Sequence, residues 1–217
     1  MMNKRAVIDS ISKEKLIVIV RGVEREKLIP LCEALYDGGI RLVEITFDMK
    51  GNVSSYETSQ NIAMLCEAFD GRMLIGAGTV VNLEQAKAAF KGGAKYLISP
   101  NTDEKIIRFA NENNIVSIPG AMTPTEIVNA YNYGADFVKV FPSDSLGLGY
   151  IKAVRAPLSH IPMLCVGGVT EHNVADFLAT GVSGVGVGSN IIKKAYVDSG
   201  DFAAITELAK AYCSAIK

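Results

Sequence analysis

Histidine is scarce in this chain and cysteine is scattered, and both facts restrict its chemistry. Only two histidines occur among 217 residues, His160 and His172, and neither belongs to an HExxH or similar spacing. The four cysteines, at positions 32, 66, 165 and 213, form no CxxC pair. Zinc sites and disulfide frameworks depend on such spacings. We therefore expect no metal site, and reduced cysteines as in a cytosolic protein.

The chain also lacks a long apolar run and an excess of charge of either sign. No stretch reaches the ~18 consecutive apolar residues that a membrane span requires. Residues 1–11 carry charges and do not resemble a signal peptide. A net charge of −1 gives no general attraction to nucleic acid or to an anionic membrane. We predict a soluble, cytoplasmic protein that binds neither.

Hydrophobic residues are plentiful, and this predicts a well-packed globular chain. They make up 49% of the sequence and charged residues 21%, which allows a sizeable core and argues against disorder. A length of 217 residues suits one large α/β domain. No linker, low-complexity tract or change of composition divides the chain, so we predict a single domain over residues 1–217.

Short apolar runs alternate with amphipathic stretches along almost the whole chain. The runs predict strands at 16–20, 42–47, 74–77, 96–99, 116–118, 137–141, 163–166 and 184–187. The other stretches predict helices near 25–37, 54–69, 83–91, 103–113, 124–133, 148–156, 171–180 and 201–216, with an extra helix over 1–12. Eight strand–helix units favour a (β/α)8 TIM barrel with an extra N-terminal helix over the main alternative, a doubly wound open sheet.

One lysine stands in the middle of the apolar run 137–141. Side chains alternate along a strand, so Phe137, Lys139 and Phe141 share one face. Burial between phenylalanines lowers the pKa of a lysine, and a partly neutral amine attacks carbonyl carbon to give a Schiff base. The same pattern also suits a lysine whose tip reaches water or pairs with a buried carboxylate.

Further polar residues stand at the predicted strand ends, where a barrel carries its active site. Glu44 interrupts the apolar run 42–47 and must there be paired, protonated or functional. Together with Lys139 it suits either a structural ion pair or a catalytic pair in which the carboxylate moves protons. Arg21 ends the first strand and suits either a substrate carboxylate or a simple rim position.

Glycines also gather at these strand ends. Gly167-Gly168 and Gly188-Ser189 close the last two strands, where barrels often bind phosphate through backbone N–H groups. We predict phosphate binding there, and a merely structural turn is the alternative. The compact turn 76–79 ends in Thr79, whose hydroxyl group is suited to bonding a substrate carboxylate.

Taken in order, these motifs resemble the 2-keto-3-deoxy-6-phosphogluconate / 4-hydroxy-2-oxoglutarate aldolase family, class I lyases on a (β/α)8 barrel. The resemblance runs from about residue 13 to about residue 195. Its markers are GGIRLVEIT at 38–46, IGAGTV at 75–80, ISPN at 98–101, IPG at 118–120, VKVFP at 138–142 and VGGV at 166–169. Several motifs in order are far more specific than any one of them.

The resemblance implies a reaction that needs no metal or other cofactor. Lys139 would form an iminium ion with the C2 ketone of a 2-keto-4-hydroxy acid, and Glu44 would shuttle protons through water. The products would be pyruvate and a short aldehyde, glyceraldehyde 3-phosphate or glyoxylate. Members of the family are commonly trimers, so a homotrimer is expected by analogy. The implied substrate-binding residues are Arg21 and Thr79 for the carboxylate, Pro100 and Phe141 for the pocket wall, and Gly167, Gly168, Gly188 and Ser189 for a phosphate.

Two positions depart from the phosphogluconate-type pattern of the family. Asp48 stands where many members have an arginine that contacts the substrate, and Val166 stands where a threonine often lies beside the phosphate glycines. Arg21 alone would then hold the carboxylate, as in galactonate-type relatives. The departures leave the lyase chemistry unchanged and the exact substrate open.

Two rival functions are also compatible with a barrel. Another phosphate-binding barrel enzyme, an isomerase or a thiamin-phosphate-type synthase, accounts for the glycines but gives no reason for Lys139. A non-catalytic barrel that binds a keto acid or sugar phosphate as a sensor is compatible with the fold, because barrels host many functions. Such a sensor has no need of the pair of Glu44 and Lys139.

Overall fold

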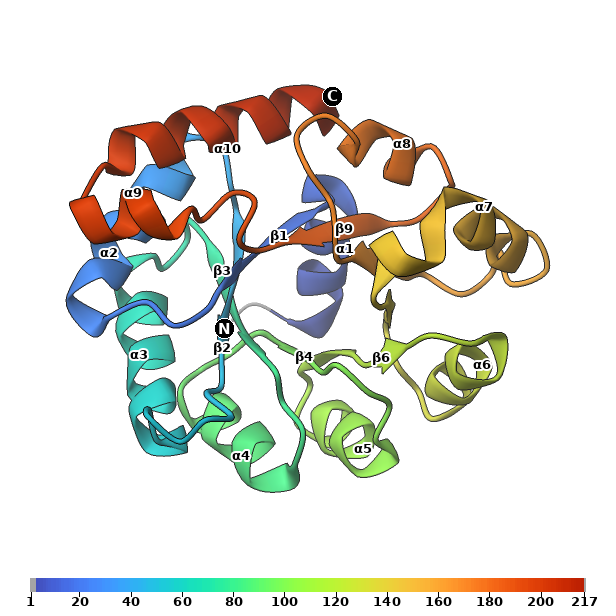
Figure 1. Ribbon diagram of the computed structural model, residues 1–217. Helices are drawn as coiled ribbons and strands as arrows, with labels where there is room; N and C mark the ends of the chain where they lie inside the picture. Colours follow the sequence, from blue (N-terminus) through green and yellow to red (C-terminus); the bar gives the residue numbers. More distant parts are fainter. Residues whose placement is uncertain (1–2, 217) are drawn as a thin grey trace.

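The computed structural model describes residues 3–216 and shows a parallel barrel ringed by helices (Figure 1). The strands are β1 (Leu16–Val20), β2 (Leu42–Thr46), β3 (Leu74–Gly78), β4 (Tyr96–Ile98), β5 (Val116–Ile118), β6 (Gly120–Ala121), β7 (Val138–Val140), β8 (Met163–Val166) and β9 (Gly184–Val187). The helices are α1 (Lys4–Glu14), α2 (Arg25–Asp37), α3 (Ser55–Ala68), α4 (Leu83–Lys91), α5 (Glu104–Glu112), α6 (Pro124–Asn132), α7 (Ser143–Arg155), α8 (Val174–Leu178), α9 (Lys194–Ser199) and α10 (Phe202–Ile216). The barrel and its extra N-terminal helix confirm the predicted fold class.

The strands pair in the order β5-β4-β3-β2-β1-β9-β8-β7-β6, and every pair is parallel. β5 coincides with the predicted fifth strand, and β6 continues it beyond Pro119, which has no N–H to donate, as a short strand that was not predicted. Backbone hydrogen bonds from Phe137 N to Ser117 O (3.3 Å) and from Lys139 N to Pro119 O (2.8 Å) join this strand to β7. The barrel therefore closes, and the open-sheet alternative is wrong.

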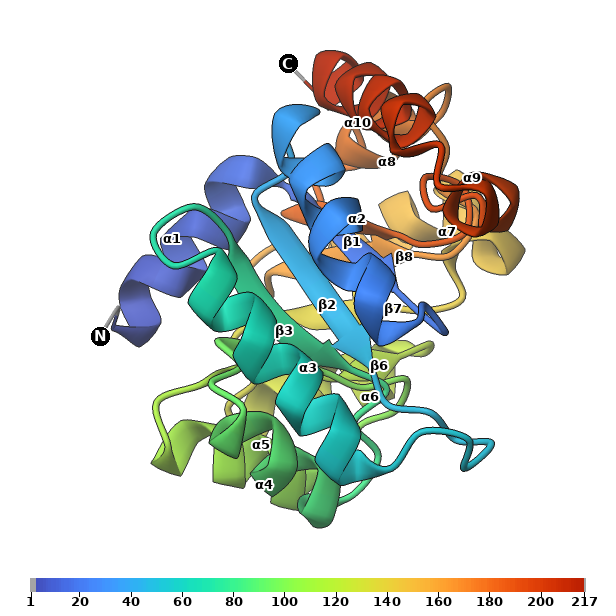
Figure 2. The same cartoon turned by 90° about the vertical axis from the view of Figure 1, so that its left-hand side faces the viewer.

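Apolar side chains fill two layers, one inside the barrel and one between the strands and the helices. The inner layer includes Tyr96, Ile118 and Phe137. The outer layer is larger and lies under the helices, and Figure 2 shows how α2 and α3 cover β2 and β3. This division follows from strand alternation, because successive residues face the interior and the helices in turn.

Three helical segments differ from the sequence-based prediction. α7 begins at Ser143, and Gly147 interrupts it with φ 75° and ψ 162°, so the predicted helix 148–156 is only its second part. α8 covers Val174–Leu178 rather than 171–180, because the Asn173 side chain accepts the Thr170 N–H in a preceding turn. α9 was not predicted. None of the helices within residues 3–216 is long and apolar enough to cross a membrane.

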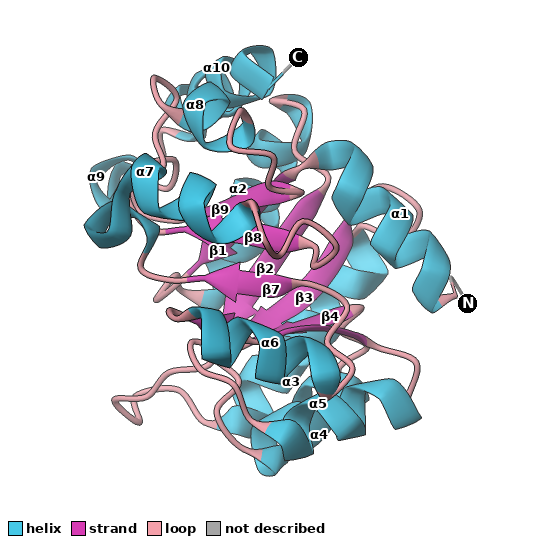
Figure 3. Cartoon of the chain, turned by 90° about the vertical axis from the view of Figure 1, so that its right-hand side faces the viewer, coloured by secondary structure: helices cyan, strands magenta, loops and turns pink. Residues whose placement is uncertain are grey.

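The helix predicted over 1–12 is α1, and it lies across the N-terminal ends of the strands (Figure 3). Residues 1–2 of that prediction lie outside the described chain. The Asn3 side chain caps the helix by accepting the Ala6 N–H at 2.8 Å. Val7 and Ile11 are buried against the inner apolar layer. The helix therefore closes one end of the barrel and leaves the C-terminal ends of the strands as its mouth.

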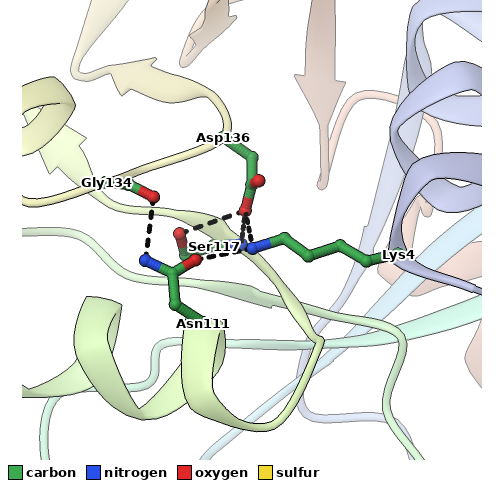
Figure 4. A network of polar contacts seen from close by, with 5 residues as sticks. All are labelled: Lys4, Asn111, Ser117, Gly134 and Asp136. Atoms are coloured by element: carbon green, nitrogen blue, oxygen red, sulfur yellow. Dashed lines mark hydrogen bonds and ion pairs between the residues drawn. The ribbon is translucent and has the colours of Figure 1, made fainter.

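A polar network fastens α1 to the strands (Figure 4). Lys4 Nζ lies 2.9 Å from an Asp136 carboxylate oxygen and donates to Asn111 Oδ1 at 2.6 Å. The same Asp136 oxygen accepts the Ser117 N–H at 2.8 Å. Asn111 Nδ2 donates to Gly134 O at 3.0 Å. The network joins α1 to α5, β5 and the residues that enter β7.

Candidate active site

Three side chains of the segment around β7 follow one another along the barrel interior. Phe137 is buried in the inner apolar layer, Lys139 is 7% exposed, and Phe141 is 36% exposed at the mouth. Lys139 Nζ lies 4.6 Å from the centroid of the Phe141 ring, within the range of a cation–π contact. The predicted shared face is therefore confirmed, and the amine lies against the aromatic ring on its mouth side.

Glu44 points into the barrel from β2 and is 2% exposed. Its Oε2 atom is one of two buried side-chain N or O atoms within residues 3–216 that have no hydrogen-bond partner. Glu44 and Lys139 line the same small cavity, whose volume of about 10 Å³ is at the lower limit for one water molecule. The other lining residues are apolar or glycine, namely Ile17, Ile19, Ile98, Ile118, Leu164, Val166 and Gly186.

Burial acts on both ionisable groups in the direction that favours their neutral forms. Desolvation raises the pKa of Glu44 from 4.5 to about 7, although the charges of Lys139 and Arg21 oppose the change. Desolvation also lowers the pKa of Lys139, against the attraction of Glu44. No Lys139–Glu44 ion pair occurs among those found over residues 3–216. The two groups are thus an amine and a carboxyl whose pKa values move toward each other, which suits proton exchange.

The predicted carboxylate ligands meet at the mouth of the barrel. Arg21 follows β1, and its Nη2 atom donates to Thr79 Oγ1, beyond β3, at 3.1 Å. Thr79 has φ 58°, in the left-handed region that a β-branched residue adopts only when its surroundings impose it. The strained turn places a hydroxyl group next to a guanidinium group, and both side chains retain access to solvent.

The structure brings the predicted phosphate glycines to neighbouring strand ends. Gly188 and Ser189 line a pocket of about 310 Å³ together with Arg21. Gly167 and Gly168, beyond the adjacent strand β8, do not line this pocket and have φ of 107° and 68°. Glycine is required at position 168 on a second ground, because a Cβ there would lie 2.3 Å from the Cβ of Asp144. The turn therefore packs closely on the start of α7.

Pro100 and Phe141, the predicted pocket wall, lie together at another part of the rim. They line a separate pocket of about 350 Å³ with Met122 and Tyr133, among others. Phe141 therefore has the Lys139 amine on one side and contributes to this rim pocket on another. The rim pocket adjoins the amine through Phe141, and the Arg21 pocket shares Ile19 with the small cavity that Lys139 lines.

Asp48 organises the loop between β2 and α3. Its carboxylate accepts the N–H groups of Lys50 (2.8 Å), Asn52 (2.7 Å) and Val53 (3.1 Å). These bonds, that of Lys50 foremost, lower the pKa of Asp48. The residue that replaces the family's arginine thus stabilises its own loop.

Two buried polar residues of the barrel were missed in the sequence. Ser143 is fully buried, donates to Val140 O at 2.7 Å and accepts the Val166 N–H at 3.0 Å, which ties the ends of β7 and β8 together. Tyr96 is fully buried inside the barrel. A tyrosine within an apolar strand is a recognisable signal, whereas a serine after Pro142 gives none. Over residues 3–216, no group of three or more His, Cys, Asp or Glu could hold a metal ion.

A lysine and a glutamate buried together inside a (β/α)8 barrel suit the chemistry of a class I aldolase. Residues 7–208 match the model of the KDPG and KHG aldolase family. The chain belongs to this family.

Named relatives agree with this assignment. The chain is 36% identical over 183 residues to the 2-dehydro-3-deoxy-6-phosphogalactonate aldolase of Escherichia coli K12, covering 84% of this chain and 86% of that protein. It is 33% identical over 212 residues to the 2-dehydro-3-deoxy-phosphogluconate aldolase of Pseudomonas aeruginosa, covering 95% and 92%. A Legionella pneumophila KDPG aldolase with pyruvate captured as a covalent carbinolamine superposes with a TM-score of 0.85 at 27% identity, covering 97% and 98%.

Proposed function

We propose that this protein cleaves a 2-keto-3-deoxy-6-phospho sugar acid or 4-hydroxy-2-oxoglutarate to pyruvate and a short aldehyde, with Lys139 as the Schiff-base residue. The observation that carries the proposal is the buried Lys139 amine, whose lowered pKa favours the nucleophilic neutral form, beside a carboxyl with a pKa of about 7. Its family membership supports the same chemistry.

In the first half of the reaction, neutral Lys139 Nζ adds to the C2 ketone and gives a carbinolamine. Glu44 in its protonated form gives a proton to the C2 hydroxyl, which leaves as water, and an iminium ion remains. Ionised Glu44 next accepts the C4 hydroxyl proton, through a water where the distance requires it. The C3–C4 bonding electrons move to the iminium nitrogen, so the aldehyde leaves and an enamine stays on Lys139.

In the second half, Glu44 returns its proton to C3 of the enamine. The pyruvate iminium ion that results is hydrolysed, which frees pyruvate and the lysine. One carboxyl therefore acts alternately as acid and base, and a pKa of about 7 populates both forms at neutral pH.

The substrate carboxylate is assigned to Arg21 and Thr79, which already share a hydrogen bond at the mouth. Pro100 and Phe141 are assigned to the pocket wall. A phosphate, where the substrate carries one, is assigned to the glycine segments Gly167-Gly168 and Gly188-Ser189 at adjacent strand ends. Because Asp48 is engaged by its own loop, we assign no carboxylate contact to that position.

The test is to incubate the protein with pyruvate and sodium borohydride and to map the reduced adduct by peptide mass spectrometry. We expect a pyruvyl adduct on Lys139 that is absent from the Lys139→Met variant. Lys105→Met, which removes an exposed lysine of α5, is the matched control and keeps the adduct. Absence of any adduct on the folded wild-type protein would refute the aldolase mechanism and favour a binding protein.

The substrate is then identified by comparing substrates that differ in one group. The substrates are 2-keto-3-deoxy-6-phospho sugar acids of both C4 configurations and 4-hydroxy-2-oxoglutarate. We expect their kcat/KM values to differ, and the substrate with the highest value is the preferred one. A Ser189→Asp substitution places a negative charge beside Gly188 and should raise the KM of a phosphorylated substrate while leaving pyruvate trapping intact.

A homotrimer and a cytoplasmic location also remain predictions, and the first is tested by light scattering after gel filtration.

A further inference from the structure

Strand β3 carries two glycines, Gly76 and Gly78, although glycine weakens a strand. Neither has a left-handed φ, so backbone conformation does not demand glycine at these positions. Both face the interior of the barrel, since a Cβ at either position would meet a side chain that points inward. Space is therefore the reason for both glycines.

At Gly78 the occupant of that space is the Glu44 carboxyl group. A Cβ at position 78 would lie 2.5 Å from Glu44 Oε1, 2.6 Å from its Cδ and 2.9 Å from its Oε2. Real Cβ atoms do not approach other atoms this closely, so even alanine would force the carboxyl, the end of a flexible side chain, to another position. The carboxyl rests directly against the backbone of Gly78.

At Gly76 the occupant is the Tyr96 ring. A Cβ there would lie 2.1 Å from Tyr96 Cε2. The Tyr96 hydroxyl donates to Val43 O at 2.7 Å and lies 3.3 Å from Leu74 O, which fixes the ring across β2 and β3. Gly76 is the register partner of Glu44, so the ring fills the space beside the Glu44 backbone.

These two contacts together set the direction of the Glu44 side chain. Gly78 is the register partner of Thr46, two residues nearer the mouth than Glu44. The carboxyl therefore leans toward the mouth, in the space that Gly78 leaves, while the Tyr96 ring occupies the space on the other side. Glu44 reaches the cavity that it shares with Lys139 from this position.

We propose that Gly78 and Tyr96 are positioning residues that hold the Glu44 carboxyl toward Lys139, Gly78 by leaving space and Tyr96 by filling it. The proposal rests on the proposed function, because it concerns the proton transfers assigned to Glu44. Both residues act through the Glu44 side chain and exchange no proton themselves. The positioning role concerns only the pyruvyl half of the substrate.

Proton transfer alone can be measured with pyruvate. A pyruvate iminium ion that loses a C3 proton to Glu44 and regains one from solvent exchanges its methyl hydrogens, so ¹H NMR in D₂O reports the base without any aldehyde. We expect Gly78→Ala to lower the exchange rate about 10²-fold, the scale of a misplaced catalytic group. Borohydride trapping of pyruvate at long incubation should persist.

Two further readouts separate positioning from a general weakening of the fold. The midpoint of the exchange rate against pH, expected near 7 in the wild type because of the pKa of Glu44, should shift or vanish in Gly78→Ala. In a double-mutant cycle, Glu44→Gln with Gly78→Ala should be no slower than Glu44→Gln alone. Gly149→Ala is the matched control, since a Cβ at that exposed helical position meets nothing within 4 Å.

Tyr96 is tested with a pair of substitutions. Tyr96→Phe keeps the ring and should stay within about threefold of the wild-type exchange rate, whereas Tyr96→Leu empties the space beside Glu44 and should lower the rate at least tenfold. This pair tests the proposal independently if Gly78→Ala does not fold.

The outcomes distinguish failure of the aldolase function from failure of the positioning role. A wild type that neither traps pyruvate nor exchanges its methyl hydrogens refutes the proposed function and this proposal with it. A wild type that does both, with Gly78→Ala or Tyr96→Leu folded and equally fast, refutes the positioning role alone. The positioning role is also refuted if the double variant slows exchange by the product of the two single-variant factors. Gly78 and Glu44 would then act independently.

Discussion

Lys4 of α1 lies at the closed end of the barrel, and Lys139 of β7 points into the barrel interior. The surroundings of these two lysines differ. Lys4 meets a carboxylate, Asp136, and an amide oxygen of Asn111, so its charge is balanced (Figure 4). Lys139 has an aromatic face and a carboxyl that forms no ion pair with it. A satisfied lysine stabilises a structure, whereas a desolvated lysine without a close partner is reactive. Both lysines are largely buried, so the difference between them lies in whether the charge has a partner.

The largest expected effect concerns Lys139. We expect Lys139→Met to lower pyruvate release from any accepted substrate by at least about 10³-fold, because the covalent step is lost. The free energy of unfolding should stay the same or rise, since a methionine of similar shape removes a desolvated amine. Steady-state kinetics and urea denaturation measure the two quantities. A variant that loses both activity and stability would assign Lys139 a structural role like that of Lys4.

The next effect concerns Glu44 and pH. Its folded-state pKa of about 7 exceeds the ordinary 4.5, so the native protein binds more protons than the unfolded chain between these values, and stability falls as pH rises through this window. Glu44→Gln stays neutral. Its free energy of unfolding relative to the wild type should therefore grow by about 3 kcal/mol from pH 4.5 to above pH 7. Urea denaturation at several pH values measures this, and a pH-independent difference would contradict the raised pKa.

The smallest effect concerns Lys4. We expect Lys4→Met to lower the free energy of unfolding by about 2 kcal/mol, because Asp136 and Asn111 lose a partner at a largely buried site. The kcat/KM value should stay within about twofold, since α1 lies at the closed end of the barrel. Arg5→Met, which removes an exposed ion pair of the same helix, is the control and should cost less than about 1 kcal/mol. If the fall in kcat/KM, expressed as a free energy, were as large as the loss in the free energy of unfolding, the two ends of the barrel would be coupled.

The barrel was predictable from periodicity, and the helix boundaries were less so. β1, β2 and β8 are recognisable in the sequence as apolar runs, because both faces of a barrel strand are buried. The break at Pro119 and the kink at Gly147 depend on single backbone geometries that a periodic pattern does not carry. α9 is only six residues long, too short to show a helical period.

The sequence predicted which residues belong to the candidate site but not how they are arranged in space. The sequence singles out Lys139 and Glu44 because charges are conspicuous in apolar strands. It does not show that Tyr96 fills the space beside Glu44, because residue 96 lies more than fifty positions away along the chain. The use of the Asp48 carboxylate to stabilise its own loop was likewise hidden, although the N–H groups that donate to it are at most five residues away.

The sequence by itself determined the order of strands and helices, the single lysine in the β7 segment and the glycines at the strand ends. These features are local, and each follows from the side chains of a few consecutive residues. Only the tertiary structure decided which groups are paired. Closure of the barrel placed Asp136 against Lys4, left Oε2 of Glu44 without a partner and laid its carboxyl on Gly78. Desolvation, and with it the pKa of each group, depends on that long-range packing, because a charge loses its water only when distant segments surround it.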